Sequence, residues 1–379
     1  MKICIVSDKH FIEKEPHFAL ELKKLGHSCF FICDIKNNYK NVQKFFPVLP
    51  VKFWQIENNA LVKNNVIKFF KKIKFNIVLS DTLFPAGYFG YLAKKSNKKI
   101  TNLVFPTGAD IQYFPKIKYG FKNDARKNKL INLTTKYFDG YLFGAKQLKN
   151  DFYKNWQPND GHKIWYVPAG HATPSYKTLE KEKLQNKYGL ENKFIILTLS
   201  RLHPKKNIEH LIKIMPTILK KDKKFHLIIA GNYEKLWYKE RLKQEIKKYK
   251  LENNVQLIGK VTGRKKKEIF LLSSIFIIPS VCEVVPATLL ESFHYGLPVI
   301  STPVGHSIDL IKQGKNGFLV PHNKPNTLCD KILSLKENSN LRKIIAANGK
   351  ITAEKHRWKN CINKWVEVFE EAINIVKNK

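Results

Sequence analysis

Short apolar runs alternate with segments of helical periodicity along most of the chain. Residues 2–7 form a continuous apolar run, which is typical of a strand buried on both faces. Residues 16–25 follow with apolar positions at helical spacing and end at Gly26, a residue type that favours the end of a helix. Further strands are predicted at 28–35, 76–79, 100–105, 140–143 and 163–167, and helices at 66–74, 84–95 and 130–137. This alternation predicts an α/β domain with a parallel, doubly wound sheet.

The pattern restarts after a polar stretch. Residues 172–192 are mostly polar and charged, which predicts a linker and a short helix, and an apolar run at 194–199 opens a second α/β series. Its later strands are predicted at 225–230, 255–257, 275–278, 298–301 and 317–320, and its helices at 207–219, 236–249, 266–272, 287–295, 326–335, 341–353 and 358–376. A chain of 379 residues is also too long for one core. We expect one domain over residues 1–172, a second over 173–355 and a C-terminal helix over 356–379.

The chain is strongly basic, with 68 lysines and arginines against 31 aspartates and glutamates and a formal net charge of +37. Nucleic acid, an anionic membrane surface and anionic small substrates are the partners that such a charge serves. The excess is spread over the whole chain together with many asparagines, so a plain compositional bias explains it equally well. Charge alone therefore does not choose a partner.

The six cysteines include no CxxC pair, which indicates buried free thiols rather than a zinc site or a disulfide framework. The sequence opens directly on an apolar strand without the pattern of a signal peptide. No apolar run approaches the roughly 18 residues that a transmembrane helix needs. We expect a cytoplasmic protein, either soluble or peripheral at the inner face of the cell membrane.

The most informative stretch is residues 277–306. A buried strand leads into a loop with Glu283, Pro286 stands where a helix would begin, and that helix carries Glu291. The N-terminus of a helix at a strand end offers unpaired N–H groups, so a diphosphate fits there. Two carboxylates, one before the helix and one on it, would then accept hydrogen bonds from hydroxyls on either side of the phosphates. Parallel sheets bind their ligands at this end of the strands.

A cationic cluster follows the first strand of the second domain. Arg201 and Lys206 lie after the strand at 194–199 and around the start of the next helix. Cleavage of a sugar–phosphate bond leaves negative charge on the phosphate, so cations already in place lower the barrier. An arginine and a lysine at this spacing are weak evidence in a chain this basic. The stronger evidence is the order of strand, loop, helix and strand over residues 277–306.

The second half of the chain resembles the donor-binding domain of a GT-B-fold retaining glycosyltransferase, of glycosyltransferase family 4 (glycosyl transferases group 1). Glu283 and Glu291 match the family's E-x7-E motif, and the surrounding PS…E…LLES…GLPVI…VG matches as a block. The resemblance is strong over residues 194–335 and weaker over 1–173. It implies two Rossmann-like domains facing across a cleft, the first for the acceptor and the second for the donor. The helix at 358–376 resembles the family's last helix, which crosses back to the first domain.

Carried over residue by residue, the resemblance implies a donor site. Arg201 and Lys206 would contact the pyrophosphate, Glu283 the transferred sugar and Glu291 the ribose hydroxyls. The remaining donor contacts would come from Val284, Val285, Pro286 and Ala287 at the helix start, and from Gly231, Gly259 and Lys260 near the base. For Gly231, an ordinary turn is an equally good interpretation.

Three loops depart from the family's pattern. The glycine-rich loop expected after the first strand reads SDKHFIEKEPH, so Lys9 and His10 are candidates for contacts with the diphosphate or the acceptor, or belong to a solvated loop. The family's His-Gly-x-Asp sequence keeps its aspartate as Asp110 but has Thr107 in place of the histidine, and both residues are candidate contacts of the acceptor or the sugar. His306 stands where a second glycine is expected, and is a candidate contact of the sugar or a plain loop histidine.

The resemblance also implies a chemistry. Retention implies front-face attack, in which the proton of the acceptor hydroxyl passes to the leaving phosphate oxygen, with catalysis by positioning and charge stabilisation. The donor would be a nucleoside-diphosphate sugar, a UDP-sugar foremost, with no further cofactor and no metal, since fixed cations take the place of a divalent ion. The acceptor would be a glycan or a lipid-linked molecule of surface polysaccharide, lipopolysaccharide or glycolipid biosynthesis.

Two segments of the first domain set basic residues beside aromatic or aliphatic ones. Residues 113–129 interleave lysines and an arginine with tyrosines and phenylalanines, and the helix at 66–74 alternates Ile67, Phe70 and Ile73 with lysines. Such segments suit an anionic bilayer or a lipid diphosphate, and equally a solvated face. We expect the membrane contact, if the protein makes one, to involve them.

Two rival classes remain. Another GT-B enzyme, such as a nucleotide-sugar epimerase or a phosphorylase, does not account for the E-x7-E block. A nucleic-acid-binding protein is supported by charge alone, because no nucleic-acid module is recognisable. We therefore expect a sugar transferase without a nucleic-acid partner.

Overall fold

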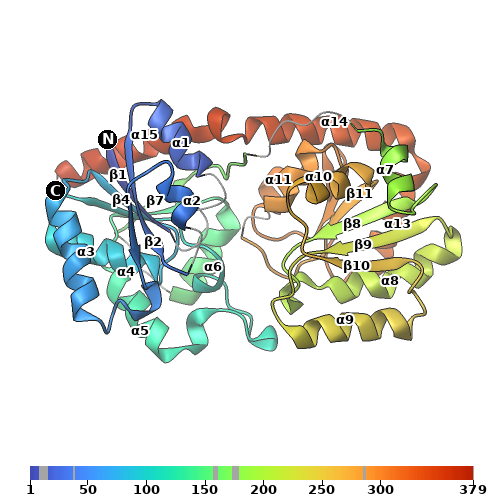
Figure 1. Cartoon of the computed structure of the whole chain (residues 1–379), viewed down its shortest axis with the longest axis horizontal. Helices are drawn as coiled ribbons and strands as arrows, with labels where there is room; N and C mark the ends of the chain where they lie inside the picture. The colour runs from blue at the N-terminus through green and yellow to red at the C-terminus, as the bar shows by residue number, and fades with distance from the viewer. Residues whose placement is uncertain (8–15, 37–38, 157–160, 173–178, 285–286, 379) are drawn as a thin grey trace. The chain divides into compact units, whose positions relative to one another are not determined.

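A computed structural model describes residues 1–7, 16–36, 39–156, 161–172, 179–284 and 287–378 of the chain. The chain forms two compact units (Figure 1). Unit 1 consists of Met1–Ala172 together with Arg357–Lys379, and unit 2 of Thr173–His356. Each unit is an α/β layer structure around its own parallel sheet, so both are Rossmann-like. This confirms the predicted fold class.

Unit 1 contains a seven-stranded sheet in the order β3-β2-β1-β4-β5-β6-β7, and all of its strand pairs are parallel. The strands are β1 (Lys2–Ser7), β2 (Ser28–Asp34), β3 (Val48–Val51), β4 (Ile77–Ser80), β5 (Thr101–Val104), β6 (Gly140–Phe143) and β7 (Lys163–Tyr166). The sequence pattern did not indicate β3, which contains Pro50 and follows Pro47. A proline is tolerated in this strand because β3 lies at an edge of the sheet.

Helices cover the sheet of unit 1. They are α1 (His17–Lys24), α2 (Tyr39–Gln43), α3 (Ala60–Lys72), α4 (Ala86–Ser96), α5 (Ala125–Thr135), α6 (Lys146–Trp156) and α15 (Trp358–Lys377), with short 3-10 turns η1 (Phe53–Gln55), η2 (Gly108–Asp110), η3 (Pro115–Ile117) and η4 (Phe121–Asn123). Within the described residues, none of these helices or those of unit 2 combines the length and the apolar character needed to span a bilayer.

The last helix, α15, completes the core of unit 1 although it follows unit 2 in the sequence. Trp365 on α15 is fully buried, and its ring lies 4.8 Å from Phe18 and 5.4 Å from Phe105. Its indole Nε1 donates a hydrogen bond of 2.9 Å to the carbonyl of Pro168. A Cβ at Gly170 would come within 2.2 Å of the Trp358 ring, so a glycine lets the chain pass close to the start of this helix.

Helix α3 corrects an expectation about the basic helix at 66–74. The helix begins six residues earlier, where the Asn59 side chain accepts a hydrogen bond of 3.0 Å from the amide of Val62. Val66 and Phe70 are buried, and α3 packs against α4. Of the three apolar residues in that expectation, Phe70 is therefore buried while Ile67 and Ile73 are half-buried, and the exposed face of α3 carries lysines together with Leu61, which is 70% exposed.

Unit 2 contains a six-stranded parallel sheet in the order β10-β9-β8-β11-β12-β13. The strands are β8 (Phe194–Leu199), β9 (Phe225–Ala230), β10 (Val255–Gly259), β11 (Ile275–Ile278), β12 (Val299–Ser301) and β13 (Gly317–Leu319). The helices are α7 (Lys181–Lys187), α8 (Ile208–Lys221), α9 (Leu236–Lys248), α10 (Gly263–Leu272), α11 (Ala287–His294), α12 (Ser307–Leu310), α13 (Pro325–Glu337) and α14 (Ser339–Lys355), with the 3-10 turn η5 (Pro204–Lys206).

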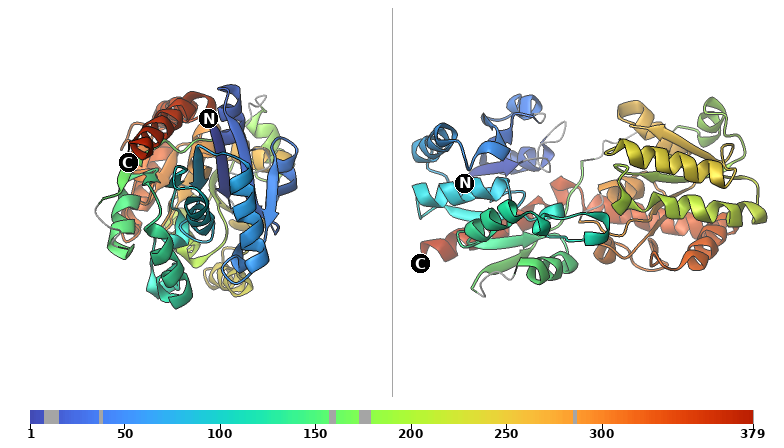
Figure 2. Two further views of the ribbon diagram at one scale, coloured as in Figure 1. Left: turned by 90° about the vertical axis from the view of Figure 1, so that its left-hand side faces the viewer. Right: turned by 90° about the horizontal axis from the view of Figure 1, so that it is seen from below.

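The two faces of this sheet have separate apolar cores. Alternate residues of β8 point to opposite faces: Ile196 packs with residues of α8, α9 and α13, whereas Ile195 and Leu197 pack with residues of α7, α10 and α11. The right-hand view of Figure 2 shows helices of unit 2 in front of its sheet. Because both faces are covered, ligands reach the sheet at its ends, and the loops after the strands carry the site.

Candidate functional site

An ion pair between Lys206 and Glu283 forms the centre of the candidate site in unit 2. Lys206 ends η5, which follows β8, and Glu283 lies in the loop after β11. The Lys206 Nζ contacts Glu283 Oε1, and the two side chains are only 11% and 8% exposed. The Ser280 hydroxyl donates a hydrogen bond of 2.8 Å to the same oxygen. Strands β8 and β11 are neighbours in the sheet, and this pairing brings the two loops together.

The electrostatics of this pair keep the carboxylate ionised. Burial acts to raise the pKa of Glu283, but Lys206, Lys205 and the Ser280 hydroxyl outweigh it and hold that pKa below its ordinary value. A buried carboxylate with a buried ammonium at its side is costly to break, because either charge alone would be left unpaired. The site therefore contains a fixed cation and a fixed anion.

Lys205 is a residue of this cluster that sequence reasoning missed. It is 5% exposed, and burial is the main reason why its pKa falls to about 8, with Glu283 acting in the opposite direction. Its backbone amide donates to His203 Nδ1 at 3.1 Å, and its carbonyl accepts from the amide of Val281 at 2.9 Å. The only sign of it in the sequence is its position next to Lys206, because a sequence does not distinguish a buried lysine from an exposed one.

Arg201 lies at the exposed rim of the cluster. Its guanidinium is 3.2 Å from Glu234 Oε2, and the two side chains are 59% and 38% exposed. It is close enough to lower the pKa of Lys205, but the described contacts do not join it to Glu283. The backbone of Gly231 lies close to that of Ser200, the residue before Arg201. The φ of Gly231 is +147°, and a Cβ there would meet the carbonyl oxygen of Ser200 at 1.6 Å. A close backbone contact, and not a turn alone, requires glycine at this position.

Glu291 forms a second ion pair on α11. Its Oε1 is 2.5 Å from the Nζ of Lys266 on α10, with the side chains 20% and 30% exposed. Its Oε2 is buried and has no hydrogen-bond partner. Lys266 is another residue that sequence reasoning missed, because the contact joins two helices that are far apart in sequence. The two predicted carboxylates thus each have a lysine partner.

The loops after β11 and β12 are locked together. The amide of His306 donates a hydrogen bond of 2.9 Å to the carbonyl of Val284. Gly305 has φ +50°, and a Cβ there would meet the carbonyl oxygens of Val284 and Glu283 at 2.4 and 2.5 Å. The close contact between the two loops therefore requires glycine at position 305, next to the backbone of Glu283.

His306 is an inward residue of this site. It is 4% exposed, its Nδ1 has no hydrogen-bond partner, and its ring centroid is 6.2 Å from that of His356. Burial, with a contribution from His356, lowers the pKa of His306 to about 4, so the imidazole is neutral near pH 7. The structure does not place it on an open surface.

The other predicted donor residues are distributed around these loops. Val284 is buried, whereas Ala287 at the start of α11 and Lys260 after β10 are exposed. Gly259 has φ +69° with open space around it, and its carbonyl accepts a hydrogen bond of 2.8 Å from Gly231. Four predicted residues lie outside the described part of the chain: Lys9, His10, Val285 and Pro286.

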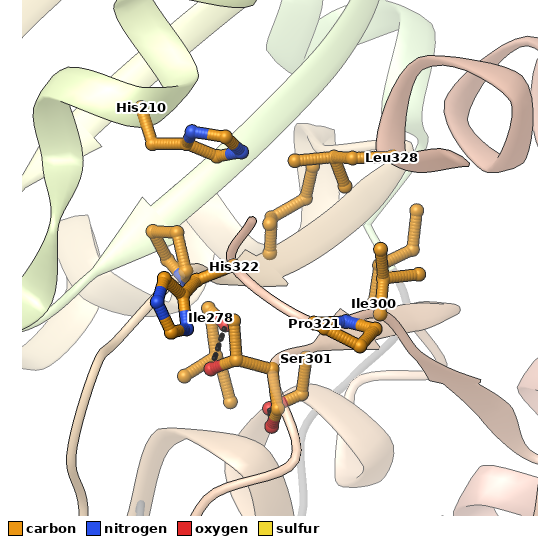
Figure 3. A pocket seen from close by; sticks show the side chains of 11 residues that line it. His210, Ile278, Ile300, Ser301, Pro321, His322 and Leu328 are labelled. Atoms are coloured by element: carbon orange, nitrogen blue, oxygen red, sulfur yellow. Dashed lines mark hydrogen bonds between the residues drawn. The ribbon is translucent and has the colours of Figure 1, made fainter. Parts of the chain in front are cut away.

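A small pocket with about 220 Å³ of empty space lies at the same end of the sheet (Figure 3). It is lined by apolar residues such as Ile278 and Leu328 and by two imidazoles, His210 and His322. The Thr302 hydroxyl on its wall is used internally, because it donates to the carbonyl of Ser280 at 2.5 Å. None of the predicted site residues lines this pocket, so the charged cluster and the pocket are separate features.

In unit 1, Thr107 and Asp110 form a capped turn. Asp110 Oδ2 accepts hydrogen bonds from the amides of Leu83 at 2.6 Å and of Thr107 at 3.4 Å, and the Thr107 hydroxyl donates to the carbonyl of Asp81 at 3.0 Å. Asp110 is 1% exposed, and burial raises its pKa to about 8 against the effect of these amides. A local structural role explains why the aspartate remains when the histidine is replaced.

Among the described residues, no group of three or more histidine, cysteine, aspartate or glutamate side chains is arranged to hold a metal ion. The six cysteines are all buried and free, as expected. What the cluster in unit 2 presents is a set of positive charges, Lys206, Lys205 and Arg201, next to two carboxylates on either side of the start of α11.

Known proteins resemble this chain in sequence and in fold. The family model of glycosyl transferases group 1 matches residues 180–352, which lie within unit 2. An uncharacterised glycosyltransferase of Methanocaldococcus jannaschii is 28% identical over 365 residues, covering 90% of this chain and 87% of the relative.

Two solved structures share the whole fold. Anabaena HepE in complex with UDP and glucose superposes with a TM-score of 0.79 at 19% identity, covering 98% of this chain and 100% of that one. A glycosyltransferase from Rickettsia africae gives a TM-score of 0.77 at 22% identity, covering 98% of each chain. The chain thus has the GT-B fold, and its residues 180–352 match the family model of glycosyl transferases group 1.

Proposed function

We propose that the chain is a retaining, metal-independent glycosyltransferase that uses a nucleoside-diphosphate sugar, foremost a UDP-sugar. The observation that carries this proposal is the buried Lys206–Glu283 pair on the loop that leads into α11, with Glu291 on the helix itself. Anabaena HepE, which shares the fold, was solved with UDP and glucose, and this supports the choice of nucleotide.

In this proposal the cations bind the diphosphate and the carboxylates bind hydroxyls. Lys206, with Arg201 and Lys205, offsets the charge that develops on the leaving phosphate. Glu283 accepts a hydrogen bond from the transferred sugar, and Glu291 accepts one from the ribose. Lys266 keeps the Glu291 carboxylate in place until the nucleotide arrives, since it contacts only one of the two oxygens.

The transfer step needs no separate base. The bond between C1 of the sugar and the phosphate oxygen breaks, a bond forms between C1 and the acceptor oxygen on the same face, and the hydroxyl proton passes to the leaving phosphate oxygen. The residues of unit 2 contribute position and charge to this step. The neutral His306 supports the loop of Glu283 from behind, through its backbone contact with Val284.

We further propose that unit 1 binds the acceptor, a glycan or a lipid-linked molecule of surface polysaccharide or glycolipid biosynthesis. The exposed lysines of residues 115–122, Lys116, Lys118 and Lys122, suit an anionic acceptor or an anionic membrane surface at the inner face of the cell membrane. Lys127 is committed elsewhere, because its Nζ lies 4.5 Å from the centre of the Phe121 ring.

Thermal shift with a panel of nucleoside diphosphates and their sugars tests the donor site. A ligand at about 100 times its Kd stabilises the native state by about 2.7 kcal/mol, so the right nucleotide gives a clear rise in Tm. Sugar transfer or donor hydrolysis should then continue in EDTA. Activity that disappears on chelation and returns with manganese would contradict the metal-independent site, and a flat panel would contradict the nucleotide site.

A further inference from the structure

Helix α9 begins with two adjacent large apolar side chains that face solvent. Leu236 is 77% exposed and Trp237 is 55% exposed, whereas Trp365 and Trp165 in unit 1 are 0% and 7% exposed. Scattered single apolar residues are normal on a protein surface, but two neighbours that include an indole form a contact area. Neither residue has a place in the donor site.

The rest of the outer face of α9 is cationic. At 100° per residue, Leu236 and Trp237 lie on the same side as Arg241, Lys243, Lys247 and Lys248, which are all exposed. The opposite side, formed by Tyr238, Leu242 and Ile246, is buried in the core of unit 2. Two of these cations have carboxylate partners, Lys243 with Glu240 at 3.2 Å and Arg241 with Glu209 at 3.1 Å, whereas Lys247 and Lys248 add unbalanced positive charge. Figure 1 shows α9 as an outermost element of unit 2.

This combination fits one partner best. Indole rings prefer the boundary between headgroups and acyl chains, leucine adds apolar area below it, and lysine and arginine attract anionic lipids. Lys235 precedes the apolar pair, and Lys239 is held over the Tyr233 ring at 5.0 Å, which adds positive charge around it. A protein partner of acidic composition would match the charges but gives no reason for the adjacent Leu–Trp pair at the helix start.

We propose that the outer face of α9, defined as Leu236, Trp237, Arg241, Lys243, Lys247 and Lys248, binds an anionic lipid bilayer. Leu236 and Trp237 enter the interfacial layer, and the four cations lie against the headgroups. This inference rests on the proposed lipid-linked or membrane-adjacent acceptor, and it assigns the contact to unit 2 rather than to the basic segment of unit 1.

The surface is directly connected to the charged cluster. Glu234, two residues before Leu236, pairs with Arg201, and Leu202 forms a parallel bridge with Tyr233. A bilayer that holds the start of α9 therefore also holds the loop against which Arg201 lies. Binding there brings the donor loops of unit 2 close to the lipid surface.

Flotation with phosphatidylcholine vesicles, with and without phosphatidylglycerol and at low and high salt, tests the surface. We expect the full chain to bind only the anionic vesicles, and the double variant L236S/W237S to bind at least about tenfold more weakly. W237F should bind like the wild type but lose most of the fluorescence quenching by brominated lipid. The UDP-induced rise in Tm should be the same in all of these proteins.

The chain offers a matched control on α14, where Ile344 and Ile351 are 57% and 56% exposed. The variant I344S/I351S removes a similar apolar area and should leave vesicle binding unchanged. A second control, K116Q/K118Q/K122Q, tests the basic segment of unit 1 and should weaken binding less than L236S/W237S does.

Several results would overturn the assignment. If L236S/W237S binds like the wild type, or if only K116Q/K118Q/K122Q loses binding, the contact surface is not α9, although the membrane proposal stands. If no anionic vesicle binds the wild type while UDP still raises Tm, the bilayer is not the partner but the donor site is unaffected. If L236S/W237S instead abolishes a concentration-dependent increase in mass, the face binds a second copy of the chain.

Discussion

The carboxyl edges of the two sheets differ in how they hold their acidic side chains. In unit 2 the edge carries ionised side chains that are already paired, Lys206 with Glu283 and Lys266 with Glu291. In unit 1 the edge holds Asp110, whose pKa is raised by burial to about 8, so that this carboxyl carries a proton at pH 7. The positive charge of unit 1 lies outside this edge, on exposed lysines.

The difference shows where the chemistry is fixed. Charged groups that are already in place stabilise the transition state without having to rearrange. In the proposed function every donor contains a diphosphate, and the arrangement in unit 2 suits this constant charge. In the proposed function unit 1 binds the acceptor, and a hydrogen-bonded edge with a basic outer surface imposes less on acceptors of varied charge and shape. We expect substitutions in unit 2 to change the rate, and those in unit 1 to change stability or acceptor preference.

The largest effect is expected for Lys206→Met. The change removes the cation beside the leaving phosphate and leaves Glu283 without its closest partner, so kcat/KM should fall by about 10²–10³. Steady-state transfer assays with a Tm measurement check it. Lys221→Met, at the exposed end of α8, is the control and should be silent. Near-normal transfer by the Lys206 variant would remove the contrast between the two edges.

The two carboxylates of unit 2 should separate binding from turnover. Glu291→Gln weakens a charge-assisted hydrogen bond to the nucleotide, which is worth about 1.5–3 kcal/mol and corresponds to about 10–150-fold in the Kd of UDP. Glu283→Gln should leave the Kd of UDP unchanged or improved, because it removes a negative charge near the phosphates, and should lower kcat. Calorimetry and kinetics on both variants decide this. Equal effects on Kd would mean that both carboxylates hold the nucleotide.

Two glycines compare the rigidity of the two edges. Gly305 in unit 2 and Gly108 in unit 1 both have positive φ, at +50° and +66°. A Cβ at 305 meets backbone oxygens at 2.4 and 2.5 Å, whereas at 108 it meets only the Tyr119 hydroxyl at 3.3 Å. Gly305→Ala should therefore lower the free energy of unfolding by about 2–5 kcal/mol and Gly108→Ala by about 1–2 kcal/mol. Urea unfolding measures both, and the reverse ranking would show that the loops of unit 2 adapt.

The last test of the comparison is a pH dependence of unit 1. The pKa of Asp110 is raised from its ordinary value of 3.8 to about 8, so the folded state keeps a proton that the unfolded state releases. This contribution to stability is complete below about pH 4 and is lost as pH rises towards 8, at up to about 1.4 kcal/mol per pH unit. Asp110→Asn should remove that slope from urea unfolding curves taken between pH 5 and 8. Parallel wild-type and variant curves would show that Asp110 is ionised.

Much of the fold could be predicted from the sequence, because buried parallel strands read as continuous apolar runs and the helices between them are long enough to show their period. β3 was missed because its prolines are compatible with a strand only at a sheet edge, and the edge is known only from the pairing. α3 was predicted too short, since the polar residues Lys63, Asn64 and Asn65 separate its apolar first turn from the rest of the helix.

In the candidate site, the local sequence pointed to Glu283 and Lys206 but not to the other lysines around them. Lys205 and Lys266 belong to the cluster through contacts between segments distant in sequence, and no spacing rule reveals these. Whether Thr107 and Asp110 face a ligand or support a turn depends on burial, which sequence does not report. The roles of all these residues in donor binding remain the predictions that the variants above test.

The position of α15 has a consequence for how the protein is synthesised. Trp365 and Phe369 belong to the core of unit 1, yet the ribosome makes them after all of unit 2. Unit 2 can complete its core while the chain is still attached, whereas unit 1 waits with an uncovered apolar face for about half of the synthesis, about 10–40 s at typical rates. The nascent protein therefore finishes its second half first, and chaperone demand should fall on the half that was made first.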